Sequence, residues 1–303
     1  MTKLTVYEPF RSVFYAPQFV TLHGGHFAAE GLDVEIRTAG GGVNTTGALL
    51  DGTAQICLGG IMRSLDLADR GQPLLPHFAE VNSRNGFFLL SRRPRPGFAW
   101  ADLSGRTLLG FAEAPTPWQC LLTVLRRHGV DPGTVRIERT LPVAEAVAAF
   151  RADRTDFLEA GQPVTEQLLD AGEAHLVASM GEATGPVPFS SYMTTGRFLR
   201  EQRDTVVRFT RALYRAQRWM AGAAAEEIAA LIAPAFPDIA PDVRRRAVTR
   251  YLGQATWARH PVLTVGGYEY LQTILLDGGF IRRRHRYEDL VDDAVARHVV
   301  ETS

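Results

Sequence analysis

Residues 14–36 read FYAPQFVTLHGGHFAAEGLDVEI, and TGALLDGTAQICLGG follows at residues 46–60. Phe19 and Phe27 lie on one face at helical spacing, and Gly31 supplies the left-handed residue that ends a helix. The letters LDVEI then alternate apolar and acidic residues, as a half-buried strand does. Together with residues 3–8, these stretches predict a strand, a helix, a second strand, a short helix and a third strand.

The same order of segments resembles the solute-binding proteins for sulfonates, nitrate and thiamine pyrimidines, and the eukaryotic thiamine-pyrimidine synthases that share their fold. The similar segments are an aromatic-Ala-Pro start, FAAEGLDV and ALLDGTAQICLGG, followed by LSGRTLLG at 103–110, HGVDP at 128–132, DFLEAGQP at 156–163 and LLDGGFIRRRHRYEDL at 275–290. The resemblance implies a type II periplasmic binding-protein fold of the α/β class. In that fold two lobes, each a mostly parallel sheet flanked by helices, enclose a ligand cleft.

The length and the strand–helix alternation agree with two lobes, since 303 residues exceed what one core usually supports. We expect lobe 1 to comprise residues 1–89 and 196–303, and lobe 2 to comprise residues 90–195. The chain would cross between the lobes near 88–94 and 190–196. The sequence predicts strands at 3–8, 33–38, 54–58, 76–82, 107–112, 135–139, 156–160 and 174–179, helices at 15–30, 44–51, 61–70, 117–128, 143–151 and 163–171, and a mostly helical C-terminal part.

The charge and composition of the chain limit the kinds of partner and cofactor that we expect. The 33 basic residues balance 33 acidic ones, so no net charge favours nucleic acid or a membrane surface. No apolar run reaches the length of a membrane span. Lys3 is the only lysine, which leaves no lysine near a cleft for the pyridoxal phosphate that the synthases use, and we expect no cofactor. As the sequence stands, without a signal peptide, a cytoplasmic protein is expected; removal of a signal sequence would make it periplasmic.

Ligands of open parallel sheets bind beyond the carboxyl ends of the strands, so we take the candidate site from those ends. The candidates share a place in a loop or at a helix start where the two lobes should face each other. They are Arg11, Phe14, Tyr15, Gly41, Gly59, Gly60, Asn82, Glu113, Thr116, Trp118, Glu159, Gln162, Ser190 and Tyr192.

Two features of lobe 2 indicate the chemistry of the ligand. Pro115 and Pro117 remove two N–H donors from a helix start that cradles an anion in the resembling proteins, and Trp118 adds an indole. Glu159 interrupts an apolar strand, where it either pairs with an arginine such as Arg139 or faces the cleft and binds an amine or aminopyrimidine edge. We therefore expect stacking by Tyr15, Trp118 and Tyr192 on a small aromatic or heteroaromatic solute, either pyrimidine-like or an aromatic compound with amino or carboxyl groups.

Two classes of function remain open from the sequence. One is a solute-binding protein that closes by hinge motion and delivers its ligand to an ABC-transporter permease. The other is an enzyme on the same fold, similar to the pyrimidine synthases or to aromatic desulfinases, with Cys57, Glu159 or a cleft histidine as the reactive group. We favour the binding protein, because the catalytic residues of both enzyme groups are missing. His23 and His26 lie three residues apart without further ligands nearby, so we expect no metal.

Overall fold

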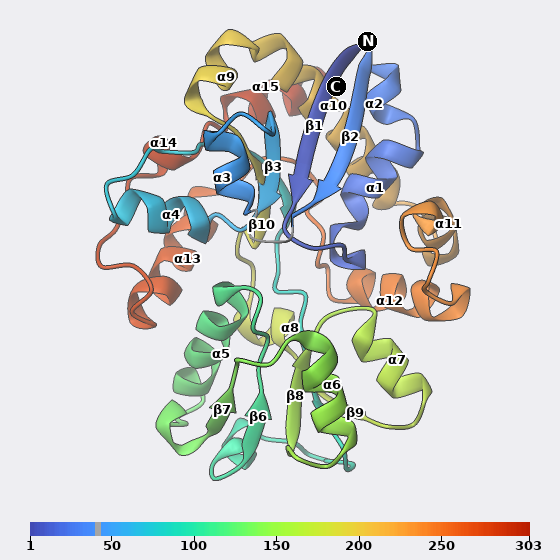
Figure 1. The fold of residues 1–303 in the computed structure, drawn as a ribbon, viewed down its shortest axis with the longest axis vertical. Coiled ribbons are helices and arrows are strands. Elements are labelled where there is room, and N and C mark those ends of the chain that lie inside the picture. Colours follow the sequence, from blue (N-terminus) through green and yellow to red (C-terminus); the bar gives the residue numbers. More distant parts are fainter. Residues whose placement is uncertain (40–43) are drawn as a thin grey trace.

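The computed structural model of the protein describes residues 1–39 and 44–303, and the predicted site residue Gly41 lies outside them. The described part forms two lobes, one above the other in Figure 1, each built on one five-stranded sheet. This confirms the predicted α/β fold of two sheets flanked by helices.

Lobe 1 contains the sheet with strand order β2-β1-β3-β10-β4. Its strands are β1 (Thr2–Glu8), β2 (Leu32–Thr38), β3 (Ile56–Gly59), β4 (His77–Asn82) and β10 (Ser190–Met193). The helices around it are α1 (Ala16–His23), α2 (His26–Ala29), α3 (Thr45–Leu50), α4 (Met62–Asp69), α9 (Gly196–Glu201), α10 (Arg203–Met220), α11 (Ala225–Leu231), α12 (Pro241–Gly253), α13 (Val265–Asp277), α14 (Tyr287–Leu290) and α15 (Ala294–Thr302).

Lobe 2 contains the sheet with strand order β7-β6-β8-β5-β9. Its strands are β5 (Phe88–Ser91), β6 (Thr107–Leu109), β7 (Arg136–Glu138), β8 (Phe157–Ala160) and β9 (His175–Ser179), and its helices are α5 (Pro115–Arg127), α6 (Val143–Arg151), α7 (Val164–Asp170) and α8 (Met180–Thr184). In each sheet one strand, β10 or β5, is antiparallel to both of its neighbours. Each therefore enters the sheet from the crossing that precedes it.

Both crossings between the lobes lie a few residues earlier in the chain than predicted. Strand β5 starts at Phe88 and already pairs with β8 and β9, and β10 starts at Ser190 and already pairs with β3 and β4. The chain therefore crosses between the sheets at about 83–87 and 185–189 rather than at 88–94 and 190–196. Residues 88–91 and 190–193, which lie within the predicted crossings, are buried strands that pair on both sides.

The predicted helix at 15–30 is divided in two. Gly25, the residue directly before α2, adopts a φ of 73°, a left-handed conformation that interrupts the helix after α1. A Cβ on Gly24 would lie 2.6 Å from the Val20 carbonyl oxygen, so the chain passes closely over the end of α1 at this point. The pair Gly24-Gly25 thus separates two short helices where the sequence pattern suggested one.

The core of lobe 1 forms where α10 packs on the sheet. The Phe209 ring of α10 lies 4.8 Å from the ring of Phe27, 4.8 Å from that of Tyr192 and 6.1 Å from that of Phe78, as measured between centroids. All four side chains are buried. None of the described helices combines the length and the apolar character that a bilayer span needs.

An ion network joins the two lobes through α7 of lobe 2 and α12 of lobe 1. These two helices lie next to each other in Figure 1. The buried Glu166 carboxylate accepts a short hydrogen bond from Arg250 and lies 3.7 Å from Arg246. Arg246 also pairs with Asp170 at 2.7 Å. The buried carboxylate of lobe 2 and its two cationic partners on lobe 1 thus link the two lobes directly.

We expect Glu166→Gln to lower the free energy of unfolding by about 1–3 kcal/mol, since the two partner arginines lose their buried counter-charge but stay partly exposed. The same change should increase the radius of gyration measured by small-angle scattering, because the lobes lose this tie. Asp170→Asn is the control, and removing this exposed partner should cost less than about 1 kcal/mol. An unchanged radius and stability in Glu166→Gln would contradict the role of the network.

Candidate functional site

A cavity lies between the lobes, where loops at the carboxyl ends of strands from both sheets meet. Its volume is about 250 Å³. Lobe 1 contributes the loop after β1, and lobe 2 contributes the loops after β6 and β8 together with the starts of α6 and α7. The lining residues are Phe10, Arg11, Ser12, Phe87, Gly110, Phe111, Ala112, Glu113, Leu141, Val143, Ala146, Val147, Leu158, Glu159, Ala160, Gly161, Gln162, Pro163 and Val164.

Three phenylalanine rings form an aromatic group at this cavity. The ring of Phe111 lies 4.6 Å from that of Phe87 and 5.7 Å from that of Phe10. Phe10 belongs to lobe 1 and Phe111 to lobe 2, so this edge-on contact spans the two lobes. Sequence reasoning missed these rings, although Phe111 lies two residues after the end of β6 and Phe87 directly precedes β5.

Glu159 is the buried carboxyl residue of the cavity lining. Its side chain is buried, its Oε2 accepts a 3.4 Å hydrogen bond from the Phe111 backbone N–H, and its Oε1 has no hydrogen-bond partner in the described part of the chain. Burial raises the pKa of this carboxyl to about 7, against the opposing effects of the Phe111 N–H and Arg139. A carboxyl with one unbonded oxygen in an apolar cavity is suited to a ligand donor.

The ion pair that we weighed for Glu159 does not form among the described residues. The Arg139 guanidinium instead lies over the Trp118 indole, with its carbon 4.4 Å from the ring centroid. This stacking occupies one face of Trp118, and the indole does not line the cavity. The aromatic rings that line the cavity are instead those of Phe10, Phe87 and Phe111.

Two polar candidates that line the cavity are already engaged within the protein. Arg11 pairs with the buried carboxylate of Glu8 at 2.5 Å and lies over the Phe19 ring. Gln162 donates from Nε2 to Glu166 at 3.3 Å and accepts from the Glu166 backbone N–H at 3.2 Å. Both side chains therefore shape the cavity but bring few unused donors or acceptors to it.

Three further candidates form a buried polar group on the lobe 1 side. Asn82 donates to the Phe14 carbonyl at 2.7 Å, while its Oδ1 has no hydrogen-bond partner in the part of the chain that the structure describes. Burial raises the pKa of Tyr15, and a side-chain hydrogen bond with Ser190 opposes that effect. Asn82 and Ser190 are paired across β4 and β10. None of these side chains lines the cavity.

Phe14 and Tyr192 belong to the core rather than to the cleft. The Phe14 ring is buried against Phe189 and Tyr251. Tyr192 is fully buried, and its hydroxyl donates to Gln18 at 3.2 Å. The expectation of a Tyr192 ring at the cleft rim is wrong, because the alternation of β10 turns this side chain toward α10.

The remaining candidates lie where the lobes approach each other. A Cβ on Gly60 would lie 3.3 Å from the Phe189 carbonyl and 3.6 Å from the Thr116 hydroxyl, and one on Gly59 would lie 3.4 Å from Met193. Close protein packing therefore disfavours a side chain at Gly60, whereas a Cβ at Gly59 would make only ordinary contacts. Glu113 is exposed and lines the cavity, whereas Thr116 is buried in the first turn of α5.

Cys57, which the sequence offered as a reactive group, does not line the cavity, and neither does Cys120 or any histidine. Cys57 donates to the Thr45 carbonyl at 3.1 Å, and burial raises the pKa of both Cys57 and Cys120 to about 12. His77 is enclosed between Ser64 and Ser191, and burial lowers its pKa to about 3. Among the described residues, no group of three or more His, Cys, Asp or Glu side chains is placed to hold a metal ion.

Comparison with known proteins gives consistent matches. The model of a family described as "NMT1/THI5 like" matches residues 14–226. YtlA of Bacillus subtilis (strain 168), a candidate binding protein, is 32% identical over 302 residues, which cover 99% of this chain and 90% of YtlA.

Two solved structures share the fold over nearly the whole chain. The alkanesulfonate-binding protein SsuA from Xanthomonas axonopodis pv. citri, bound to MOPS, has a TM-score of 0.76 at 17% identity, covering 97% of this chain and 99% of SsuA. The zinc-bound ligand-binding component of an ABC-type import system from Staphylococcus aureus has a TM-score of 0.75 at 13% identity, covering 99% of each chain. At these identities the likeness concerns the fold.

The raised pKa of Glu159 predicts a pH dependence of stability. The folded protein holds the proton of Glu159 more tightly than the unfolded chain does. The resulting contribution to the free energy of unfolding is fully present below about pH 4.5 and is lost as the pH rises through about 7. We expect Glu159→Gln, which stays neutral, to exceed the native chain in stability by about 1–3 kcal/mol at pH 8 and to match it near pH 4.5. Urea unfolding at several pH values measures this difference.

Glu80→Gln is the matched control, because burial also raises the pKa of Glu80, to about 8, at a position outside the cavity. A difference between native and Glu159→Gln chains that does not change with pH would contradict the assignment.

Proposed function

The chain belongs to the NMT1/THI5-like family, and from this membership and the cavity we propose that it is a solute-binding protein for an ABC-type import system. We propose further that its ligand is a small aromatic or heteroaromatic molecule with an amino group. The observation that carries the proposal is the buried Glu159 carboxyl, with one oxygen unbonded in the described chain, facing an aromatic cavity between two lobes.

The size and lining of the cavity support a small, flat ligand. Its volume of about 250 Å³ lies just below the ~300–1,000 Å³ typical of small-molecule sites. The rings of Phe10, Phe87 and Phe111 offer apolar faces and edges to an aromatic ligand. Because Phe10 comes from the other lobe, a ligand between these rings would contact both lobes at once and favour their closure.

The charges at the cavity support an amine rather than an oxyanion. Glu113 and Glu159 both line it, and Arg11, its one lining cation among the described residues, is paired with Glu8. Helix α5 begins at Pro115, and Pro117 follows within its first turn, so two of the N–H groups that a helix start would offer are absent. An amine or the edge of an aminopyrimidine can donate to Glu159 and keep that carboxyl ionised.

The related proteins support the general class of function. YtlA is a candidate binding protein, SsuA binds alkanesulfonates, and the Staphylococcus aureus protein is the ligand-binding part of an import system. A permease of that kind is the partner that the proposal implies. The preference for an amine in place of a sulfonate follows from the lining of this chain's cavity alone.

A thermal-shift screen of aminopyrimidines, aromatic acids and alkanesulfonates tests the ligand class. A ligand at about 100–1,000 times its dissociation constant should add roughly 3–4 kcal/mol of stability, and we expect this from amino-substituted heteroaromatic compounds. Stabilisation by sulfonates alone would contradict the assignment of the cavity. A mass change of the stabilising compound would instead indicate catalysis, with Glu159 as the titratable group at hand.

Single substitutions test which aromatic side chains contribute to the free energy of ligand binding. Phe111→Ala should weaken binding of the stabilising compound by about 1–3 kcal/mol, because its ring lies in the cavity between Phe10 and Phe87. Trp118→Ala is the control, since its ring packs under Arg139 outside the cavity, and it should change binding by less than about 1 kcal/mol. Titration calorimetry on both folded variants measures the difference, and equal losses would place the ligand elsewhere in the cleft.

A further inference from the structure

A second pocket lies at the amino ends of β6 and β8, at the end of the lobe 2 sheet opposite to the inter-lobe cavity. Three segments line it: residues 92–95 after β5, residues 106–107 at the start of β6, and residues 153–156 between α6 and β8. Its volume is about 560 Å³. Because β6 and β8 run from this pocket toward the cavity, the two sites occupy opposite ends of the same strands (Figure 1).

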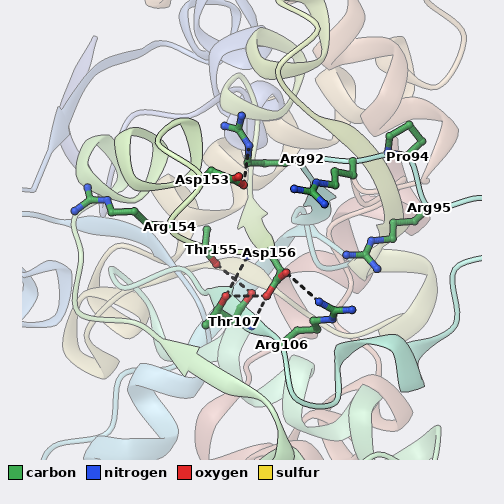
Figure 2. A pocket seen from close by; sticks show the side chains of 10 residues that line it. Arg92, Pro94, Arg95, Arg106, Thr107, Asp153, Arg154, Thr155 and Asp156 are labelled. Atoms are coloured by element: carbon green, nitrogen blue, oxygen red, sulfur yellow. Dashed lines mark hydrogen bonds and ion pairs between the residues drawn. The ribbon is translucent and has the colours of Figure 1, made fainter.

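The pocket carries an excess of positive charge. Five of its lining residues are arginines and two are aspartates, which leaves three positive charges uncompensated within it: Arg92, Arg93, Arg95, Arg106 and Arg154 against Asp153 and Asp156. Two pairs form, Arg92 with Asp153 at 3.2 Å and Arg106 with Asp156 at 3.6 Å (Figure 2). The other three arginines make no ion pair within the described part of the chain.

The fold holds several of these side chains in place. The Arg95 guanidinium lies over the ring of Phe157, with 5.1 Å between its carbon and the ring centroid, and its buried Nε has no hydrogen-bond partner among the described residues. Arg92 donates to the backbone carbonyls of Phe150, at 2.8 Å, and of Arg151. These contacts keep two guanidinium groups oriented, so binding an anion costs them little side-chain entropy.

The acidic residue at the centre is already satisfied. Asp156 accepts hydrogen bonds from the backbone N–H and the hydroxyl of Thr107, each at 2.9 Å, besides its pair with Arg106. Figure 2 shows Arg95 and Arg106 on the same side of Asp156, whereas Arg154 points outward from the neighbouring turn. Asp156 therefore positions Arg106 but has little capacity left for Arg93 and Arg95.

We propose that this pocket binds the phosphate group of a multiply charged anion. Guanidinium groups match phosphate oxygens in pairs of parallel hydrogen bonds, and the oriented, partly desolvated arginines make such bonds stronger than those of a free surface residue. An anion here would offset the repulsion among the three unpaired guanidiniums. Its phosphate could belong to a free molecule or to a lipid headgroup, since both present the same oxygens.

Titration calorimetry with pyrophosphate at low and at high salt tests the site. We expect saturable binding to the native protein, and Arg95→Gln and Arg93→Gln should each weaken it about tenfold or more through lost charge-assisted hydrogen bonds. Arg93 is exposed, so its variant keeps the test valid if Arg95→Gln fails to fold. Arg283→Gln removes the same charge from an exposed position far along the chain and should leave the affinity unchanged.

Vesicles separate the two sources of phosphate. Sedimentation with phosphatidylglycerol vesicles that pyrophosphate reverses supports a headgroup, and binding of pyrophosphate without vesicle binding supports a free anion. The absence of binding to both would overturn the proposal. So would an Arg283→Gln variant that loses as much affinity as Arg93→Gln, because that result indicates unspecific attraction to net charge.

Discussion

The structure depends on one constraint of connectivity: the chain crosses between the lobes twice, and each crossing delivers an antiparallel strand into the other sheet. Strand β5 lies between β8 and β9, and β10 lies between β3 and β4. Each of these strands is hydrogen-bonded on both sides, so neither crossing can shift without breaking a sheet. The loops at the carboxyl ends of β1, β6 and β8 consequently meet at a fixed place, where the inter-lobe cavity forms.

Most polar side chains that line the cavity have hydrogen-bond or ion-pair partners within the protein, whereas one buried carboxyl oxygen has none in the described chain. Arg11 and Gln162 bind Glu8 and Glu166, which are themselves buried, and those pairs rigidify the lining. Glu159 alone among the lining carboxyls is buried with an oxygen that has no partner in the described chain. Keeping such a group desolvated costs stability. Sites that bind ligands commonly carry that cost, because the ligand then supplies the missing hydrogen bond.

The two ends of the lobe 2 sheet differ in charge. At the carboxyl ends of β6 and β8 the cavity is aromatic and acidic, with Phe111 and Glu159. At their amino ends the second pocket is lined by arginines, with Asp156 held by Thr107. The strands between are short and buried, so two sites of opposite charge lie on one rigid element without sharing a residue.

The sequence alone determined the order and kind of most elements, because period and glycine signals are local: helix α6 runs from Val143 to Arg151 as predicted. The two-lobed fold came from the resemblance of its ordered motifs to a family of known fold, with which the chain length and the strand–helix alternation agree. The sequence also singled out Glu159 as a carboxylate that interrupts an apolar strand. Only the tertiary structure decided which side chains meet. Trp118 and Arg139 are distant in sequence but stack, Tyr192 enters the core, and Phe10 reaches Phe111 across the lobes. The contact between Trp118 and Arg139 forms within lobe 2, between α5 and the loop after β7. The placement of Tyr192 and the contact of Phe10 with Phe111 depend on the register of β10 and on the arrangement of the two lobes. No local pattern encodes either, because both arise from packing between segments more than a hundred residues apart.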